Sequence, residues 1–339
     1  MNKITKRVLI GSVAAVAVIA VSVYVLFFKA TYQLQNTTYL YIDADDNRDS
    51  IRIKLQNTAH PSILWGYKLL DCLKPVTVHS GRYAIEPNEG QLATYRKLAV
   101  GTQSPVNLTI PSVRTIDKLA GVLGKKLMID STAILSALQD SAYCAALSYD
   151  TATIMALFIP NTYQVYWNIS LDDFMKRMQK ENKHFWNENN RSELAKQTGF
   201  SQNEIMTLAS IVEEETANDA EKPMVAGMYI NRLQQQMPLQ ADPTVKFALK
   251  DFSLRRIYHK HLAVNSPYNT YLHVGLPPGP IRIPRVVTID AVLRYTKHNY
   301  LYMCAKEDFS GTHNFAATYA EHLQNARKYT QALNERNIK

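Results

Sequence analysis

The stretch Leu208–Val245, LASIVEEETANDAEKPMVAGMYINRLQQQMPLQADPTV, contains the residues that decide the fold of the second half of the chain. It begins as an apolar helical pattern, ends that pattern on three consecutive glutamates and continues into a dense polar segment. A carboxyl group among apolar neighbours loses hydration, so its pKa rises and it can hold a proton near neutral pH. A general acid needs this property, and the stretch is therefore the first candidate for an active site.

The last of the three glutamates, Glu215, is the expected general acid. A capping box at Ser201–Glu204 predicts that the helix begins at about residue 202. At about 100° per residue, Glu215 falls within the apolar arc beside Ile211, whereas Glu213 lies about 200° away. Apolar neighbours and the negative end of the helix dipole both raise the pKa of Glu215. The alternative is an acidic, solvated helix end.

Polar and aromatic side chains that could bind a substrate follow the glutamates. Asp242 stands in a turn after an amphipathic helix, where it could cap the next helix or contact substrate. Arg232 lies late in that helix, where it could complement the dipole, pair with Glu213 or bind substrate hydroxyls. The predicted substrate-binding residues are Glu213, Asn231, Arg232, Gln240, Asp242, Thr244, Tyr268, Asn269, Thr270 and Tyr271.

The composition is that of a folded protein of about two domains, with 339 residues, of which 46% are apolar and 20% charged. A net charge of +9 is compatible with a partner that is an anionic membrane, an acidic polymer or nucleic acid. We expect no nucleic-acid partner, because no run of basic residues is interleaved with aromatic ones.

Metal and cofactor sites are not expected either. His259 and His261 alternate as on a strand, but no HExxH motif or paired-cysteine spacing supports a zinc site. The sequence has no serine elbow, P-loop or dinucleotide fingerprint. Cys72, Cys144 and Cys304 are widely spaced, and we interpret them as buried free thiols.

The segment Val8–Phe28 carries no charge and is long enough, at about 1.5 Å per residue, to cross the bilayer. Three basic residues precede it and only Lys29 follows directly, which predicts that residues 1–7 are cytoplasmic and the rest lies outside. The alternative is a cleaved signal peptide, but the bulky Phe27 and Phe28 stand where cleavage requires small residues. We therefore expect an uncleaved single-pass anchor in the lipid bilayer.

The exterior part is expected to contain two α+β domains. Short elements in the order strand, helix, helix, strand, helix predict a small module at about 35–130, with the first strand at Thr38–Ile42 and a helix at Gln91–Val100. A second domain at about 150–335 follows a helical connection at 128–155. Polar loops at 237–290 are too long for mere connections and are candidates for function. The main helices of this domain are predicted at 171–187, 202–216, 219–236 and 315–333.

Together these motifs resemble the endolytic murein transglycosylases, the MltG or YceG-like family. The resemblance covers the whole plan of the chain, and it implies that the first module is LysM-like and that the second domain has a carbohydrate-binding groove. The residues that carry it are Leu208–Thr216, Asn231–Leu233, Leu239–Val245, Tyr268–Tyr271, Gly275–Pro280, His313–Phe315, Thr318, Tyr319, Glu321 and His322.

The family's catalytic glutamate is the second acid of a Glu-Lys-Glu-Thr pattern, which corresponds to Glu215. Glu214 replaces the family's usual lysine. The resemblance implies an inner-membrane enzyme with a periplasmic catalytic domain that cleaves the MurNAc–GlcNAc β-1,4 bond within glycan strands. It would leave 1,6-anhydro-MurNAc ends and terminate nascent strands near the peptidoglycan synthases.

One acid suffices for this reaction, because the carboxylate left after proton donation can take the proton of the sugar's own C6 hydroxyl. Ordinary glycosidases instead use paired carboxylates. Two alternatives remain: a hydrolase in which Asp242 or Glu213 activates water, and a non-catalytic glycan-binding scaffold.

Overall fold

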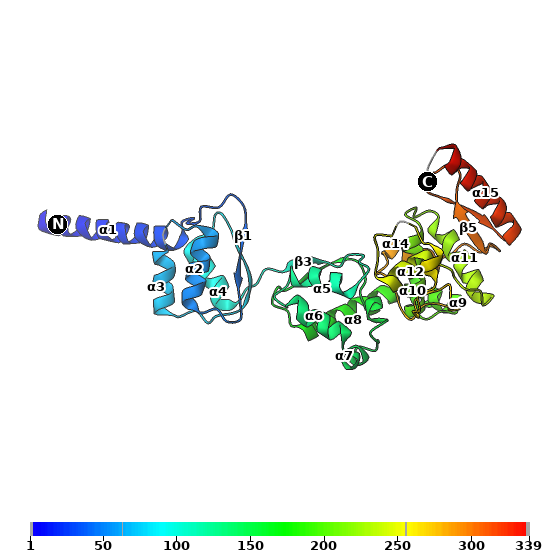
Figure 1. Cartoon of the computed structure of the whole chain (residues 1–339). Coiled ribbons are helices and arrows are strands. Elements are labelled where there is room, and N and C mark those ends of the chain that lie inside the picture. Colours follow the sequence, from blue (N-terminus) through cyan, green and yellow to red (C-terminus); the bar gives the residue numbers. More distant parts are fainter. Residues whose placement is uncertain (1–2, 63, 255, 337–339) are drawn as a thin grey trace. The chain divides into compact units, whose positions relative to one another are not determined.

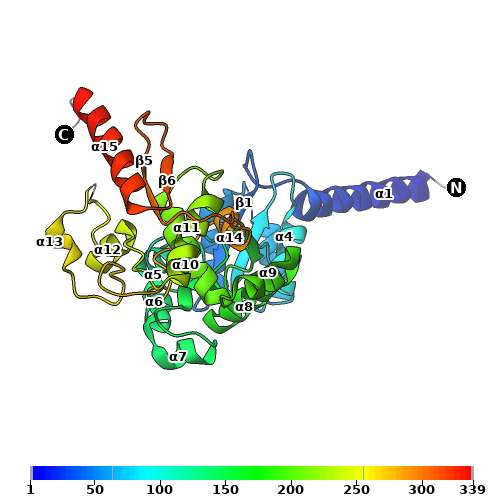
Figure 2. The same ribbon diagram turned by 90° about the vertical axis from the view of Figure 1, so that its right-hand side faces the viewer.

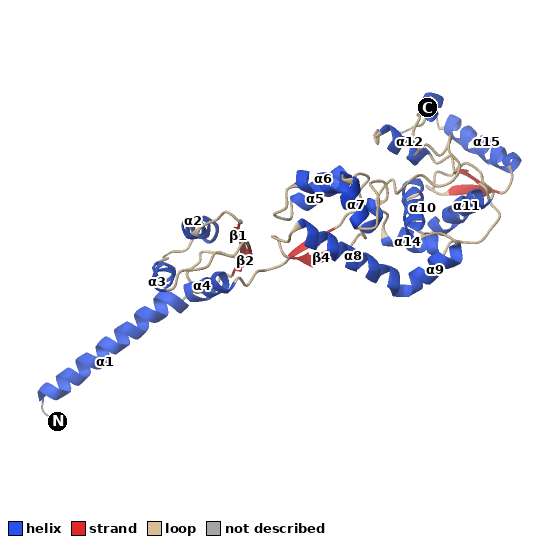
Figure 3. Cartoon of the chain, turned by 90° about the horizontal axis from the view of Figure 1, so that it is seen from below, coloured by secondary structure: helices blue, strands red, loops and turns tan. Residues whose placement is uncertain are grey.

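The computed structural model describes residues 3–62, 64–254 and 256–336, which combine many helices with a few short strands (Figure 3). They form two compact units. The first extends to Leu108 and includes residues 126–128 and 164–169, and the second comprises 109–125, 129–163 and the chain from Ser170 onward. The domain limits of 35–130 and 150–335 remain predictions.

The chain begins with α1 (Lys3–Val23), which continues as a π-helix, η1 (Tyr24–Phe28). No residue of α1 is buried, and its apolar window has a mean hydropathy of 2.6. Among the described helices it is the one long and apolar enough to cross a membrane (Figure 1). The structure thus contains a single N-terminal apolar helix that fits a membrane anchor.

The rest of the first unit is a small core in which helices cover a two-stranded sheet. Strands β1 and β2 pair antiparallel, from Thr38 opposite Ile85 to Ile42 opposite Gly81. Alternate residues of both strands point into the core, as the period of a strand requires. The element order is the one the sequence predicts. The elements are β1 (Thr38–Ile42), α2 (Arg48–Ala59), α3 (Trp65–Leu73), β2 (Gly81–Ile85) and α4 (Gln91–Val100).

Short helices make up the next part of the chain. The predicted helical connection at 128–155 is divided because Asp140 ends one helix and caps the next with its side chain. Strands β3 and β4 form a two-stranded sheet. The elements are β3 (Val106–Thr109), α5 (Ile116–Gly124), α6 (Ser131–Gln139), α7 (Ser141–Ala146), η2 (Ile154–Leu157), β4 (Thr162–Val165), α8 (Leu171–Asn187), η3 (Glu188–Asn190) and α9 (Arg191–Thr198).

The core of the second unit forms around α10 (Gln202–Glu215), which is buried from Ile205 to Val212. The predicted capping box is present, with Ser201 and Glu204 each bonding the other's backbone N–H. Helix α10 contacts α11 and α14 (Figure 2). The remaining elements are α11 (Lys222–Gln234), α12 (Asp242–Leu249), α13 (His259–Leu262), α14 (Val286–Leu293), β5 (Tyr302–Ala305), β6 (His313–Ala316) and α15 (Tyr319–Glu335).

Two details of the predicted secondary structure are wrong. His259 and His261 lie on the single helical turn of α13, not on a strand. The predicted helix at 315–333 begins only at Tyr319, because Thr318 caps it with its hydroxyl. The residues before that cap pair with β5 as the strand β6.

Candidate active site

Glu215 is the last residue of α10, followed by the C-cap Thr216, and its side chain faces a cavity of about 240 Å³. The cavity is built from the ends of α10 and α12, one side of α11 and the β5–β6 hairpin. Its lining residues are Glu215, Met228, Tyr229, Arg232, Leu239, Gln240, Asp242, Tyr271, Met303, Cys304, Ala305 and His313.

The environment of Glu215 favours its protonated form. Burial raises the pKa of this carboxyl group from its ordinary value of 4.5 to about 7. The Tyr229 hydroxyl donates a hydrogen bond of 2.7 Å to Oε1 and opposes this rise, while the negative charge of Asp242 adds to it. Burial is the largest of these effects, so the carboxyl group of Glu215 can hold a proton near neutral pH.

Asp242 is the second carboxylate of the cavity. It is the first residue of α12 but does not cap it, because the N-cap is Ala241 and no side chain caps this helix end. Its Oδ1 instead accepts a hydrogen bond of 2.6 Å from the Tyr271 hydroxyl. Burial and the nearby charge of Asp242 raise the pKa of Tyr271, so this phenol remains a hydrogen-bond donor.

Arg232 shapes the cavity wall through backbone contacts. Its guanidinium group donates to the carbonyl oxygens of Leu301 at 2.6 Å and Leu239 at 2.8 Å. A longer bond of 3.4 Å reaches the side-chain oxygen of Gln240. The pairing with Glu213 considered from the sequence is not found among the described contacts of either residue.

Several predicted binding residues lie behind the cavity wall. The hydroxyl of Thr270 accepts a hydrogen bond from the backbone N–H of Ala241 and lies 2.9 Å from the hydroxyl of Thr244, which fixes the turn before α12. Asn269 donates to two carbonyls of the preceding loop, and Asn231 donates to those of His298 and Tyr300.

Tyr268 packs against Phe247, with ring centroids 4.7 Å apart. The structure therefore brings five of the predicted residues together in the cavity, namely Glu215, Arg232, Gln240, Asp242 and Tyr271. Substrate binding by any of the predicted residues remains a prediction.

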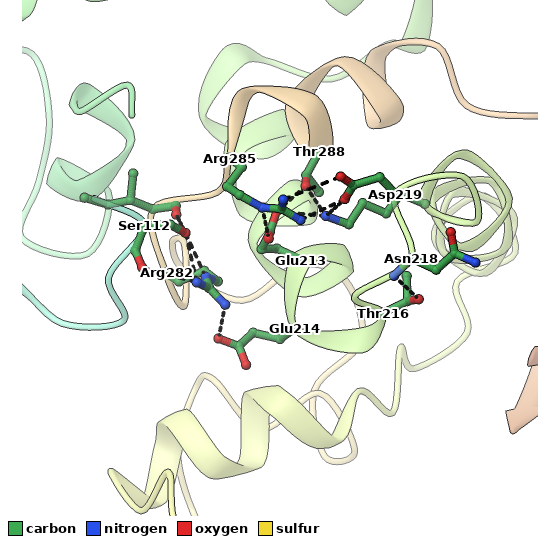
Figure 4. A network of polar contacts seen from close by, with 11 residues as sticks. Ser112, Glu213, Glu214, Thr216, Asn218, Asp219, Arg282, Arg285 and Thr288 are labelled. Atoms are coloured by element: carbon green, nitrogen blue, oxygen red, sulfur yellow. Dashed lines mark hydrogen bonds and ion pairs between the residues drawn. The ribbon is translucent and has the colours of Figure 1, made fainter. Parts of the chain in front are cut away.

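Glu213 belongs to a separate network of charges (Figure 4). It accepts hydrogen bonds from Arg285 at 2.6 Å, from Lys222 at 3.2 Å and from the Thr288 hydroxyl. The Lys222 side chain is completely buried, and it also pairs with Asp219 at 2.8 Å. Burial alone would raise the pKa of Glu213, but these partners outweigh it and hold the pKa below its ordinary value.

Glu214 is neutralised by two arginines. Arg114 donates to it at 2.6 Å and Arg282 at 2.8 Å. Figure 4 shows Arg282 between Glu214 and Ser112, which it also binds. Three consecutive glutamates thus have different environments: ion pairs surround the first two, and the third faces the cavity with a raised pKa.

Seven of the twelve lining residues were not predicted from the sequence to contribute to the site, and two of these, Tyr229 and His313, make side-chain hydrogen bonds to acidic residues. Tyr229 gives no sequence signal, because only the packing of α11 on α10 brings its hydroxyl to Glu215. His313 belongs to the residues that carry the family resemblance but was not among the predicted site residues, and it lines the cavity with its Nδ1 2.8 Å from Oε2 of Glu221. Because Glu221 also accepts from the backbone N–H of His313, the imidazole ring has a fixed orientation. A cavity with one protonatable carboxyl group among hydrogen-bonding side chains is typical of an enzyme that uses a general acid.

The comparisons with known proteins assign the chain to a family. A model of the YceG-like family matches residues 40–328. A Bacillus subtilis (strain 168) protein named endolytic murein transglycosylase is 30% identical over 273 residues, which cover 76% of this chain and 74% of that protein. The chain therefore belongs to the YceG-like family of enzymes, which includes such transglycosylases.

One more named relative and one solved structure are similar to the chain. A protein of the same name from Streptococcus pneumoniae serotype 2 (strain D39 / NCTC 7466) is 26% identical over 260 residues, which cover 68% of this chain but only 46% of that longer protein. The crystal structure of a putative YceG-like protein from Listeria monocytogenes has the same fold, with a TM-score of 0.57 and 24% identity. That match covers 86% of this chain and 99% of the other.

Proposed function

We propose that this protein is a membrane-anchored lytic transglycosylase that cleaves the MurNAc–GlcNAc β-1,4 bond within peptidoglycan strands and leaves 1,6-anhydro-MurNAc ends. The observation that carries the proposal is the partly buried Glu215, whose pKa is raised to about 7 at the wall of a polar cavity. Membership of the YceG-like family and the names of its relatives support the same reaction.

In the proposed reaction Glu215 donates its proton to the bridging oxygen while the bond from that oxygen to C1 of MurNAc breaks. The C6 hydroxyl of the same sugar then attacks C1, and its proton passes to the Glu215 carboxylate. The acid is regenerated, and no water is consumed. Tyr229 holds Oε1 through its hydrogen bond, which leaves Oε2 for the sugar oxygens.

A hydrolase remains the second candidate, because Asp242 lines the same cavity and could activate water. The hydrogen bond from Tyr271 holds Oδ1 of Asp242 in position, and Oδ2 has no hydrogen-bond donor among the described contacts. Glu213 is less suited to this role, since both of its oxygens are bound by cationic or hydroxyl groups. A non-catalytic scaffold is the third candidate.

Digestion of purified glycan strands by the full-length protein in lipid nanodiscs separates the three candidates. Mass spectrometry detects anhydro ends from a transglycosylase, reducing ends from a hydrolase and intact strands from a scaffold. Replacing Glu215 by Gln removes the transferable proton and should lower the rate by about 10²–10⁴-fold. Glu213→Gln is the matched control and should reduce the rate less; the reverse order would contradict the assignment of the acid.

The remaining expectations concern the surroundings of the enzyme. We propose that α1 and η1 cross the inner membrane with the N-terminus in the cytoplasm, so that the cavity lies in the periplasm. The first unit would act as a LysM-like glycan-binding module, and the cavity would form part of a carbohydrate-binding groove. Termination of nascent strands beside peptidoglycan synthases is the role that this placement favours, and labelling of cysteines introduced at either end of α1 tests the orientation.

A further inference from the structure

Helix α3 presents an apolar face that the described part of the first unit leaves uncovered. The face carries Trp65, Leu69 and Leu73, whose side chains are 73%, 46% and 74% exposed. Their spacing of four residues places them in one row along the helix. Cys72 also lies beside this row, and the prediction that its thiol is buried is wrong, because the side chain is exposed. Tyr67 and its neighbours on the opposite face are buried. An apolar row of this kind commonly marks a contact surface.

This face begins at the end of the apolar segment that is proposed to cross the membrane. A Cβ atom added to Gly66 would lie 2.2 Å from the carbonyl oxygen of Leu26, so the first turn of α3 touches η1 directly. Gly90, which precedes α4, approaches Phe27 in the same way. Figure 1 shows α3 on the side of the first unit from which α1 leaves. The apolar row therefore starts at the level of the last apolar residues of the anchor.

The charges around the row fit an anionic lipid surface. Lys68 and Lys74 are exposed at α3, and Lys29 is exposed directly after η1. Lys68 and Cys72 share a pocket with Arg48, Arg52 and the exposed Asp49 of α2, so the cations there outnumber the exposed acid. The acidic residue of α3, Asp71, is buried and accepts a hydrogen bond from the backbone N–H of Val76. Tryptophan and lysine are favoured at the membrane interface, where rings lie among the headgroups and lysine amines reach the phosphates.

We propose that the α3 face, formed by Trp65, Leu69, Cys72 and Leu73, lies in the interfacial layer of the bilayer that α1 crosses. This inference rests on the proposed membrane anchoring. A lone anchor helix lets the domain after it rotate freely above the membrane, whereas a second contact beside the anchor fixes how the first unit faces the bilayer.

Fluorescence quenching by lipids is the first test. The full-length protein is placed in nanodiscs of phosphatidylethanolamine and phosphatidylglycerol, with or without brominated acyl chains, which quench a tryptophan only on contact. We expect quenching in the wild type and its loss in Trp65→Phe. Of the other two tryptophans, Trp186 is buried in the second unit, and Trp167 is half-buried and packs edge-on against Tyr41 of β1, away from the α3 face. Equal signals from the two proteins would overturn the inference.

Thiol labelling gives an independent readout that needs no change in the face. Cys72 should react with a membrane-impermeant maleimide about tenfold more slowly than the thiol of a Thr102→Cys variant, each rate being normalised to the unfolded chain. Thr102 is an exposed residue after α4, about 15 Å along that helix from its contact with η1. Peptide mapping by mass spectrometry reports each cysteine separately. Equal rates would contradict burial of the face in lipid.

The proposed membrane anchor and the proposed lipid contact of the α3 face can be refuted separately. A full-length chain that does not float with liposomes refutes the anchor, and the inference falls with it. A chain that floats while Trp65 is unquenched and Cys72 reacts freely refutes only the inference. A change of Trp65 fluorescence on adding glycan fragments, without quenching by brominated lipid, would show that the row binds sugar instead.

Discussion

Replacing Glu215 by Gln should make the protein more stable at alkaline pH while removing its activity. Burial raises the pKa of this carboxyl group from 4.5 to about 7. Ionising it therefore costs more free energy in the folded state than in the unfolded state. Below pH 4.5 the group is protonated in both states, and its contribution to stability is fully present. That contribution is lost as the pH rises from 4.5 to 7.

The two pKa values give the free energy of unfolding that the wild type loses when Glu215 ionises. Their difference corresponds to at most about 3–4 kcal/mol above pH 7, and the partial exposure of the side chain reduces this to about 1–3 kcal/mol. Glutamine does not ionise and can still accept the hydrogen bond of Tyr229, so the variant avoids this destabilisation. A gain of this size shifts the melting temperature of a unit of about 200 residues by about 3–10 °C.

Scanning calorimetry of the full-length protein in nanodiscs at pH 4 and pH 8 measures this effect. Glu215→Gln should melt higher than the wild type at pH 8 and at nearly the same temperature at pH 4. Glu213→Gln is a control for which the opposite change is expected. The partners of Glu213 lower its pKa, so the ionised side chain stabilises the fold above pH 4.5. The variant should therefore melt at a lower temperature than the wild type at pH 8. If Glu215→Gln shows no gain at pH 8, the carboxyl group is hydrated and the proposed acid loses its physical basis.

The remaining predictions concern the neighbours of the two glutamates. Tyr229→Phe removes a hydrogen bond that lowers the pKa of Glu215, so the pH at which turnover falls should be higher in the variant. An unchanged pH profile would show that this hydrogen bond does not affect the ionisation of Glu215. Asp242→Asn removes a charge that raises the same pKa and should move the fall to lower pH, and a shift in the other direction would contradict the electrostatic account. Lys222→Met leaves Glu213 without its buried cation and should lower the free energy of unfolding, measured with urea, by about 3–5 kcal/mol. A loss below about 1 kcal/mol would mean that Arg285 and Thr288 suffice to stabilise the Glu213 carboxylate.

The sequence correctly predicted those helices and strands whose ends are set by neighbouring residues, such as capping residues and short alternating patterns. The strand Thr38–Ile42 and the helix Gln91–Val100 have the predicted bounds, and the capping box at Ser201–Glu204 starts α10 where expected. The strand at His313–Ala316 was missed because it is stabilised by pairing with β5, which no local pattern encodes. The turn at His259–Leu262 was misread because alternation over three residues cannot distinguish a strand from a loop or a short helix.

The same division holds for the candidate site. The helical period and the apolar arc place Glu215 at a buried helix end, and the structure finds it facing the cavity. Glu213 was expected near substrate, whereas it binds Lys222 and Arg285, which are close only after α11 and α14 pack against α10. Tyr229 was missed for the same reason. Contacts between distant segments depend on tertiary packing, which one sequence does not reveal.

The two arginines around Glu214 have an evolutionary consequence. The resemblance to the Glu-Lys-Glu-Thr pattern implies lysine at this position in relatives, and lysine here would bring three positive charges together with Arg114 and Arg282. Positions 114, 214 and 282 should therefore have diverged jointly, so that homologues with lysine at 214 carry neutral or acidic residues at the other two. Exchanging all three residues as a set should be tolerated where exchanging Glu214 alone is harmful.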